Sequence, residues 1–124
     1  MALPKSNRIV KDIDIQNILK KSFSTESSYF RAKTRKNELN TFRLLVVVSK
    51  KIAKKANQRN LIKRRIIYIF EKLKSNDKLV SSLDMMIIAK NKEVLKLPFV
   101  KIVDDILPLY KYASSKSFTA GKKI

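Results

Sequence analysis

The 124-residue sequence contains neither cysteine nor histidine. Without these side chains there is no disulfide, no thiolate nucleophile, no imidazole base and no zinc site of the usual ligands. The single glycine, Gly121, leaves no glycine-rich loop of the kind that cradles phosphates. These absences remove the commonest forms of enzyme active site, and we expect no catalytic residue and no metal ligand in this chain.

Long apolar segments are also missing. The longest uninterrupted apolar run, at residues 44–48, is far too short to span a bilayer. The N-terminus carries early charges and an early proline where a secretory signal would carry an apolar stretch. We therefore expect a soluble, cytoplasmic protein with no membrane partner and no small-molecule substrate.

Acidic residues are few. Ten Asp and Glu face 29 Lys and Arg, which gives a net charge of +19 and a pI near 10.3. Self-repulsion of this size favours a polyanionic partner, with nucleic acid ahead of an anionic membrane surface. The adjacent Asp104 and Asp105 are the basis of an alternative, a protein-only nuclease. Their side chains diverge by about 100° on a helix, which is typical of a solvated edge and not of a metal site.

The length predicts one domain, which we place at residues 1–112, with a basic tail at 113–124 that we expect to be mobile. Apolar spacing predicts an amphipathic helix at 12–21, where Ile15, Ile18 and Leu19 share one face. Further expected elements, in chain order, are a strand at 28–36, a strand containing 44–48, a helix within 52–75, a strand at 83–90 and a helix at 97–113.

The order of these elements is helix, strands, helix, strand, helix, which predicts an α+β fold with helices over one mixed sheet. The strand–helix–strand part is expected to bring its two strands parallel. The run at 44–48 is rich in β-branched residues and predicts a central strand buried on both faces. Pro108 is expected to kink or end the last helix.

The helix within 52–75 has a basic edge. Arg59 and Lys63 are spaced i and i+4, as are Asn60 and Arg64, beside an apolar stripe that begins at Ile62. Arginine offers a bidentate fork for phosphate, and the helix N-terminus adds free N–H groups. The candidate phosphate-binding residues are Lys50, Lys51, Lys54, Lys55, Arg59, Asn60, Lys63, Arg64 and Arg65. The alternative is a solvated face of a lysine-rich protein.

The strand at 28–36 alternates between two faces. Tyr29, Arg31, Lys33 and Arg35 fall on one face, and Phe30, Ala32 and Thr34 on the other. An aromatic ring beside a row of cations is typical of a platform for single-stranded RNA. The alternative is an exposed strand face with no ligand. Phe30, Phe42 and Phe70 are expected in the core.

These residues carry a resemblance to a known family. The stretch "VVVSKKIAKKANQRNLIKRRI" resembles the signature of the bacterial ribonuclease P protein subunit, approximately R-N-R-x-K-R after a strand that ends in S-K-K. The opening "LPKSNRIVKDIDIQNILKK" is similar to that family's start. The resemblance covers about residues 3–112. Leu61 departs from it, because the family usually has the second Arg of R-N-R at that position.

The resemblance implies a small α/β sandwich with a left-handed strand–helix–strand crossover. It implies a protein subunit of the ribonuclease P holoenzyme, an endoribonuclease in which the catalytic RNA and its Mg²⁺ perform the chemistry. The partners would be ribonuclease P RNA, bound by the basic helix and its preceding loop, and precursor tRNA. The 5′ leader of precursor tRNA would lie in a cleft between the first helix and the sheet, lined by Arg8, Ile15, Leu19, Tyr29, Arg31, Lys33 and Arg35.

Other departures bear on this expectation. The family often has Phe at the positions of Ile15 and Leu19, so base stacking on the first helix is reduced here. Ile67 and Tyr68 stand where Arg and Glu are common. The remaining alternative is a ribosomal or ribosome-associated basic RNA-binding protein with no role in cleavage.

Overall fold

A computed structural model describes residues 3–122, with side chains described to residue 116. Three α-helices and four strands follow one another in the expected general order. Their bounds are α1 (Asp12–Lys20), β1 (Phe23–Glu26), β2 (Phe30–Lys36), β3 (Phe42–Val47), α2 (Ala56–Ser75), β4 (Leu83–Ala89) and α3 (Phe99–Lys122), with short 3₁₀ turns η1 (Lys5–Asn7) and η2 (Lys92–Lys96). The α+β class is confirmed.

The strands form one mixed sheet in the order β1-β2-β4-β3. Strand β1 pairs with β2, and β2 with β4, in antiparallel fashion, whereas β3 and β4 run parallel. The parallel pair is the one joined through α2, as the strand–helix–strand pattern predicts. The left-handed course of this crossover stays a prediction from the family resemblance.

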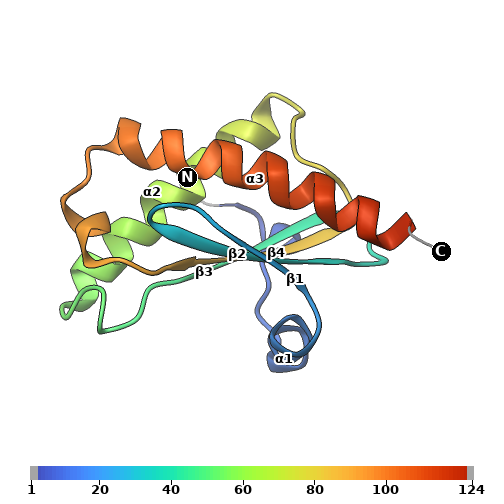
Figure 1. The fold of residues 1–124 in the computed structure, drawn as a ribbon, viewed down its shortest axis with the longest axis horizontal. Helices are drawn as coiled ribbons and strands as arrows, with labels where there is room; N and C mark the ends of the chain where they lie inside the picture. The colour runs from blue at the N-terminus through green and yellow to red at the C-terminus, as the bar shows by residue number, and fades with distance from the viewer. Residues whose placement is uncertain (1–2, 123–124) are drawn as a thin grey trace.

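Helices α2 and α3 cover one face of the sheet, and α1 lies against the other (Figure 1). The main core lies under α2 and α3, where Ile62, Ile66 and Phe70 of α2 meet Phe42 of β3. The Phe42 and Phe70 rings stack with centroids 5.5 Å apart, and Tyr110 of α3 meets the Phe70 ring edge-on, also at 5.5 Å. Phe30, Phe42 and Phe70 are all buried, as expected.

Tyr110 also fastens the segment that links α2 to β4. Its hydroxyl accepts a hydrogen bond from Val80 N at 2.8 Å and donates to the carbonyl of Lys78 at 3.1 Å. Burial raises the pKa of Tyr110, because the phenolate would lose its hydration. One side chain therefore contributes to the core and holds the loop that leads into the central strand.

The opposite face of the sheet has a smaller apolar cluster. Ile18 of α1, Ile9 and Met86 of β4 are buried there, with Ile15, Leu45, Val47 and Ile88 packed partly buried around them. A helix of nine residues covers only part of a four-stranded sheet. The remainder of this face is therefore left for polar side chains.

Strand β3 is an edge strand, so the expectation that residues 44–48 form a central strand is wrong. The central apolar strand is β4, where Leu83, Asp84, Met85, Met86 and Ile87 are all buried. In β3, burial alternates, with Leu45 and Val47 half-buried. Its outer edge pairs with the N-terminal segment, where Ile9 N donates to Leu44 O at 3.1 Å. That cover explains why an edge strand has an apolar sequence.

Two further expectations are corrected. Residues 23–26, which lie between the helix expected at 12–21 and the strand expected at 28–36, form strand β1, whose four residues are too few to show a periodic pattern. Helix α3 continues through Pro108 and past residue 112 to Lys122, and Ala113 and Ser114 are buried. The domain therefore includes part of the expected tail, and residues 123–124 lie outside the described residues. Pro108 is tolerated because it lies on the exposed side, where water can solvate the carbonyl that lacks its helical donor.

Candidate nucleic-acid interface

The loop before α2 presents four lysines in an ordered arrangement. Ile52 N and Ala53 N both donate to the Ser49 carbonyl, at 3.1 and 3.2 Å, which closes a turn. Ala53 is buried and Ile52 packs against the main core. With the apolar pair turned inward, the exposed side chains of the loop include the lysines at 50, 51, 54 and 55. The loop is thus a fixed cationic surface.

Arg59 joins this loop to the helix. Its Nη1 donates to the carbonyls of Ala53, at 3.0 Å, and Lys54, at 2.8 Å. Arg59 is half-buried one turn into α2 and holds the loop through Nη1 alone, so its guanidinium has further N–H donors that these two bonds do not use. Arg59 therefore orders the neighbouring lysines in addition to carrying its own charge. The sequence alone did not indicate this positioning role.

The other basic residues of α2 face two directions. Asn60 and Arg64 are exposed, and Lys63 is half-buried on the flank toward β3. Arg65 lies on the opposite flank, where its Nη1 donates to the Leu97 carbonyl at 3.5 Å, in the connection from η2 to α3. The structure thus brings Arg59, Asn60, Lys63 and Arg64 together with the loop lysines. It places Arg65 apart from them.

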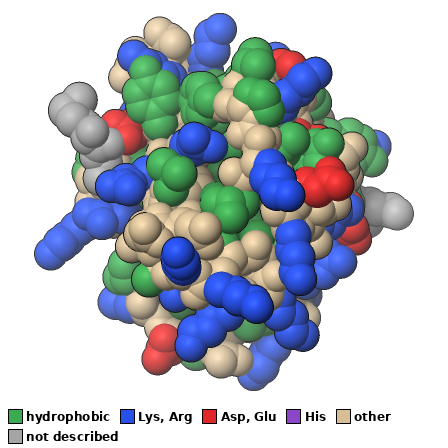
Figure 2. Space-filling model, turned by 90° about the vertical axis from the view of Figure 1, so that its left-hand side faces the viewer, with side chains coloured by type: hydrophobic (Ala, Val, Ile, Leu, Met, Phe, Trp, Pro, Cys, Tyr) green, Lys and Arg blue, Asp and Glu red, His purple; other side chains and the backbone are tan. Residues whose placement is uncertain are grey.

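We call this set the helix surface: Lys50, Lys51, Lys54, Lys55, Arg59, Asn60, Lys63 and Arg64. The end of the molecule that contains the start of α2 is shown in Figure 2, where Lys and Arg side chains cover much of the surface and acidic side chains are sparse. Leu61, at the position where the resembling family carries Arg, is 37% exposed on α2.

A second group of cations lies on the sheet face that α1 only partly covers. Arg31, Lys33 and Arg35 are half-buried on β2 and alternate with the fully buried Phe30, Ala32 and Thr34. The strand register sets Arg31 beside Ile88 and Lys33 beside Met86 on β4. We call this row, with Val47 and Ile88 beside it, the sheet surface. It combines cations with apolar side chains, which suits an unpaired nucleotide strand.

The cations of the sheet surface differ in whether they form an ion pair within the protein. Arg31 pairs with Glu26 at 3.1 Å, and Glu26 also pairs with Lys90 at 2.6 Å. These two cations, Lys90 foremost, lower the pKa of Glu26. Within the part of the chain that the structure describes, Lys33 and Arg35 have no ion pair. Lys33, in the middle of β2, is therefore the cation of this row most available to a phosphate.

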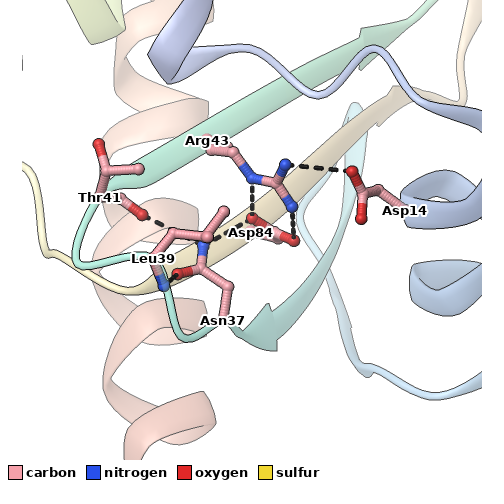
Figure 3. A network of polar contacts seen from close by, with 6 residues as sticks. All are labelled: Asp14, Asn37, Leu39, Thr41, Arg43 and Asp84. Carbon is pink, nitrogen blue, oxygen red and sulfur yellow. Dashed lines mark hydrogen bonds and ion pairs between the residues drawn. The ribbon is translucent and has the colours of Figure 1, made fainter.

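A buried ionic network fixes α1 beside this surface (Figure 3). Arg43 of β3 donates two hydrogen bonds to Asp84 of β4, Nε to Oδ1 at 2.8 Å and Nη2 to Oδ2 at 2.7 Å. Its Nη1 reaches Asp14 of α1 at 3.1 Å, and Asn37 Nδ2 donates to Asp84 Oδ1 at 2.7 Å. Hydrogen bonding to Asp84 is the main reason that the pKa of Arg43 is raised. The network sets the position of α1, and therefore one wall of the sheet surface.

Three residues expected in the leader cleft lie elsewhere or are less enclosed than expected. Tyr29 is in the turn between β1 and β2, where strand alternation does not apply, and packs against the main core on the α3 side. Arg8 is exposed on the N-terminal segment and shares a pocket with Lys63 of α2. Leu19 is 51% exposed, whereas Ile15 is half-buried against the sheet. The predicted aromatic-plus-cation platform therefore loses its aromatic member.

Asp105 has structural partners. Asp105, one of the two residues behind the protein-only nuclease alternative, accepts from Ser27 Oγ at 2.5 Å and from Tyr29 N at 3.2 Å. It thereby ties α3 to the β1–β2 turn. Among the residues described, no group of three or more acidic side chains is placed to hold a metal ion. Within the same residues, no helix has both the length and the apolar character needed to cross a bilayer.

Comparisons with known proteins agree on one family. The family model for ribonuclease P matches residues 3–114. A ribonuclease P protein component of Staphylococcus aureus is 35% identical over 120 residues, which cover 94% of this chain and 99% of that protein.

Solved structures are similar as well. A mutant ribonuclease P protein of Staphylococcus aureus with defective mRNA degradation activity superposes with a TM-score of 0.79 at 32% identity, covering 89% of this chain and 90% of that one. The ribonuclease P protein of Thermotoga maritima gives a TM-score of 0.75 at 29% identity, covering 85% and 96%.

Proposed function

Because the chain belongs to the ribonuclease P protein family, we propose that it binds the catalytic RNA through the helix surface and the 5′ leader of precursor tRNA along the sheet surface. Its role is then to promote removal of the leader, and thus maturation of the tRNA 5′ end. The RNA subunit supplies the Mg²⁺ and the chemistry in this proposal. The side chains of this protein bind both RNAs, orient the leader and neutralise RNA phosphates.

The observation that carries the proposal is the pairing of two different cationic surfaces on one small domain. The helix surface gathers seven Lys and Arg side chains and Asn60 at the start of a helix, with no acidic residue among them, which suits the phosphates of a folded RNA. The sheet surface sets Lys33 and Arg35 beside half-buried apolar side chains, which suits an unpaired strand. The leader of precursor tRNA is such a strand. The sheet surface can bind it while the helix surface holds the catalytic RNA.

The carboxylates support the division of labour. Asp14 and Asp84 hold Arg43, Asp105 holds the β1–β2 turn, and Glu26 is paired with two cations. Each of these side chains therefore has a structural partner. Composition alone is compatible with a ribosomal protein of the same charge, but the family match and the fold do not favour that alternative.

Lys33→Gln tests the leader part of the proposal. We expect this variant to weaken binding of precursor tRNA to the holoenzyme and to reduce its salt slope by about one, because one phosphate contact is lost. Binding of mature tRNA, which has no leader, is expected to stay unchanged. The measurement is the dissociation constant of both tRNAs at several salt concentrations.

Lys101→Gln is the matched control, since Lys101 is exposed on α3, which covers the other face of the sheet. It removes the same charge without touching the sheet surface and should leave the preference for precursor tRNA intact. Equal losses for precursor and mature tRNA in the Lys33 variant would place the leader elsewhere.

A further inference from the structure

An apolar pocket lies where the N-terminal segment, strand β3 and helix α2 meet. It has a volume of about 240 Å³, and its walls include Val10, Leu44, Val46 and Ile67. The two charged residues that line it are Arg8 and Lys63. No acidic side chain contributes to the lining, so the pocket combines apolar walls with a positively charged rim.

The pocket is a consequence of how the chain covers the edge of β3. Ile9 is buried and its amide donates to Leu44 O, which fixes the N-terminal segment on the strand. The next residue, Val10, is 71% exposed and stands at the mouth of the pocket. From there the chain leaves the edge toward α1. The edge of β3 beyond Leu44, at Val46, is therefore left facing the pocket.

The two rim cations are free to bind a ligand. Within the described part of the chain, neither Arg8 nor Lys63 has an ion pair or a side-chain hydrogen bond. Arg59, one turn before Lys63 on α2, is by contrast engaged by two backbone carbonyls. Free cations beside an apolar hollow fit a ligand that has a flat apolar body and a negative charge attached to it.

We propose that this pocket holds one unstacked nucleobase of the bound RNA, with the adjoining phosphate on Arg8 and Lys63. The inference rests on the proposed function, because it adds a base-binding site to the helix surface. The volume lies below the range of about 300–1,000 Å³ that is typical of drug-sized ligands, and thus suits a single ring system. Aliphatic walls can enclose the ring faces of any base.

Backbone groups can supply polar contacts to the base edge. Leu44 uses its carbonyl toward the N-terminal segment, and the backbone of an edge strand points its N–H and C=O groups outward at every second residue. The Val46 amide and carbonyl therefore face the pocket side, two residues beyond that hydrogen bond. A nucleobase inserted there can meet a donor and an acceptor in addition to the apolar walls.

The first test uses nucleotides and needs no ribonuclease P RNA. Adenosine 5′-monophosphate added to the whole protein is expected to shift the methyl NMR signals of Leu44, Val46 and Ile67 in a saturable way. Adenosine should bind at the same methyl groups about tenfold more weakly, because it lacks the phosphate. The double variant Arg8→Gln, Lys63→Gln should remove that difference. Absence of methyl shifts, or equal affinities for both compounds, overturns the inference.

The second test uses the RNA itself. Ile67→Phe fills the pocket without changing charge, and we expect it to weaken binding of ribonuclease P RNA about five- to hundredfold, the loss that corresponds to one base contact. The salt slope should stay the same. Val100→Phe, at a residue on α3 that is 60% exposed, is the matched control and should bind like the wild type. Thermal unfolding of both variants confirms that they fold.

The two ideas fail in different ways. If the wild-type protein binds ribonuclease P RNA and Ile67→Phe binds equally well, the base pocket is wrong and the proposed function stands. If the wild type does not bind that RNA at all, the proposed function fails, whereas the nucleotide titration still decides whether the pocket takes a nucleotide.

Discussion

Replacing Arg43 by Met is expected to lower the free energy of unfolding by about 3–5 kcal/mol, because Asp84 would be left as a buried carboxylate without its cation. Asp84 is 4% exposed, and both of its oxygens bond to Arg43. A loss of this size would take up a large part of the stability of an ordinary domain. Chemical denaturation measures this loss as a lower midpoint, with the same dependence of the unfolding free energy on denaturant concentration in the variant and the wild type.

The matched control is Arg31→Met. Arg31 forms an ion pair with Glu26 at a similar distance, but the two side chains are 42% and 47% exposed. Solvent screens such a pair, so we expect a loss of less than about 1 kcal/mol. Similar losses for the two variants would contradict the account of Arg43 as the buried centre of the network.

The network also links stability to the proposed leader site. Because Arg43 reaches Asp14, its removal should release α1 from the sheet in addition to leaving Asp84 of β4 without its cation. Hydrogen exchange of the α1 amides is expected to accelerate more in Arg43→Met than in Arg31→Met. Equal acceleration would mean that α1 is held by its apolar contacts alone.

Arg59→Ala is expected to weaken binding of ribonuclease P RNA by roughly a hundredfold at moderate salt, the largest effect of any single change on the helix surface. Two losses combine in this variant. The positive charge of Arg59 is removed, and the carbonyls of Ala53 and Lys54 in the lysine loop lose their hydrogen-bond donor. We therefore expect the log–log salt slope to fall by more than one, because the loop lysines no longer hold fixed positions.

Two comparison variants separate these effects. Arg64→Ala removes an exposed cation that makes no such bonds, and should cost about tenfold in affinity and about one in slope. Arg59→Lys keeps the charge but loses the guanidinium that bonds to two carbonyls. The salt slope should therefore stay close to that of the wild type, while the affinity for ribonuclease P RNA falls. If Arg59→Ala and Arg64→Ala behave alike, Arg59 acts as a charge only and does not position the loop.

Local patterns in the sequence were sufficient for most of the fold. The isoleucine stripe beginning at Ile62 indicated α2, and the alternation at residues 30–35 indicated β2 with its cations on one side. The parallel pairing of β3 and β4 followed from the helix between them. Each of these inferences depends on contacts or spacings within a short stretch of chain.

The features that escaped prediction depend on residues far apart or on exceptions to periodicity. Arg43 and Asp84 are 41 positions apart, and no pattern in the sequence around either residue indicates that the two are paired. Tyr29 looked like a member of the cationic row only because alternation was extended into a turn. The apolar sequence of β3 predicts a central strand, because sequence does not show that the N-terminal segment covers its edge. Arg59 looked like a phosphate ligand, and its bonds to the loop emerged only from the folded geometry.

The central claim is that this protein acts with a catalytic RNA. The most direct measurement is cleavage of precursor tRNA by ribonuclease P RNA at low Mg²⁺, with and without this protein, together with a reaction that contains the protein alone. We predict that the protein stimulates cleavage at the mature 5′ end, and that the protein without RNA cleaves nothing. Cleavage by the RNA that is unchanged when the protein is added would contradict the account.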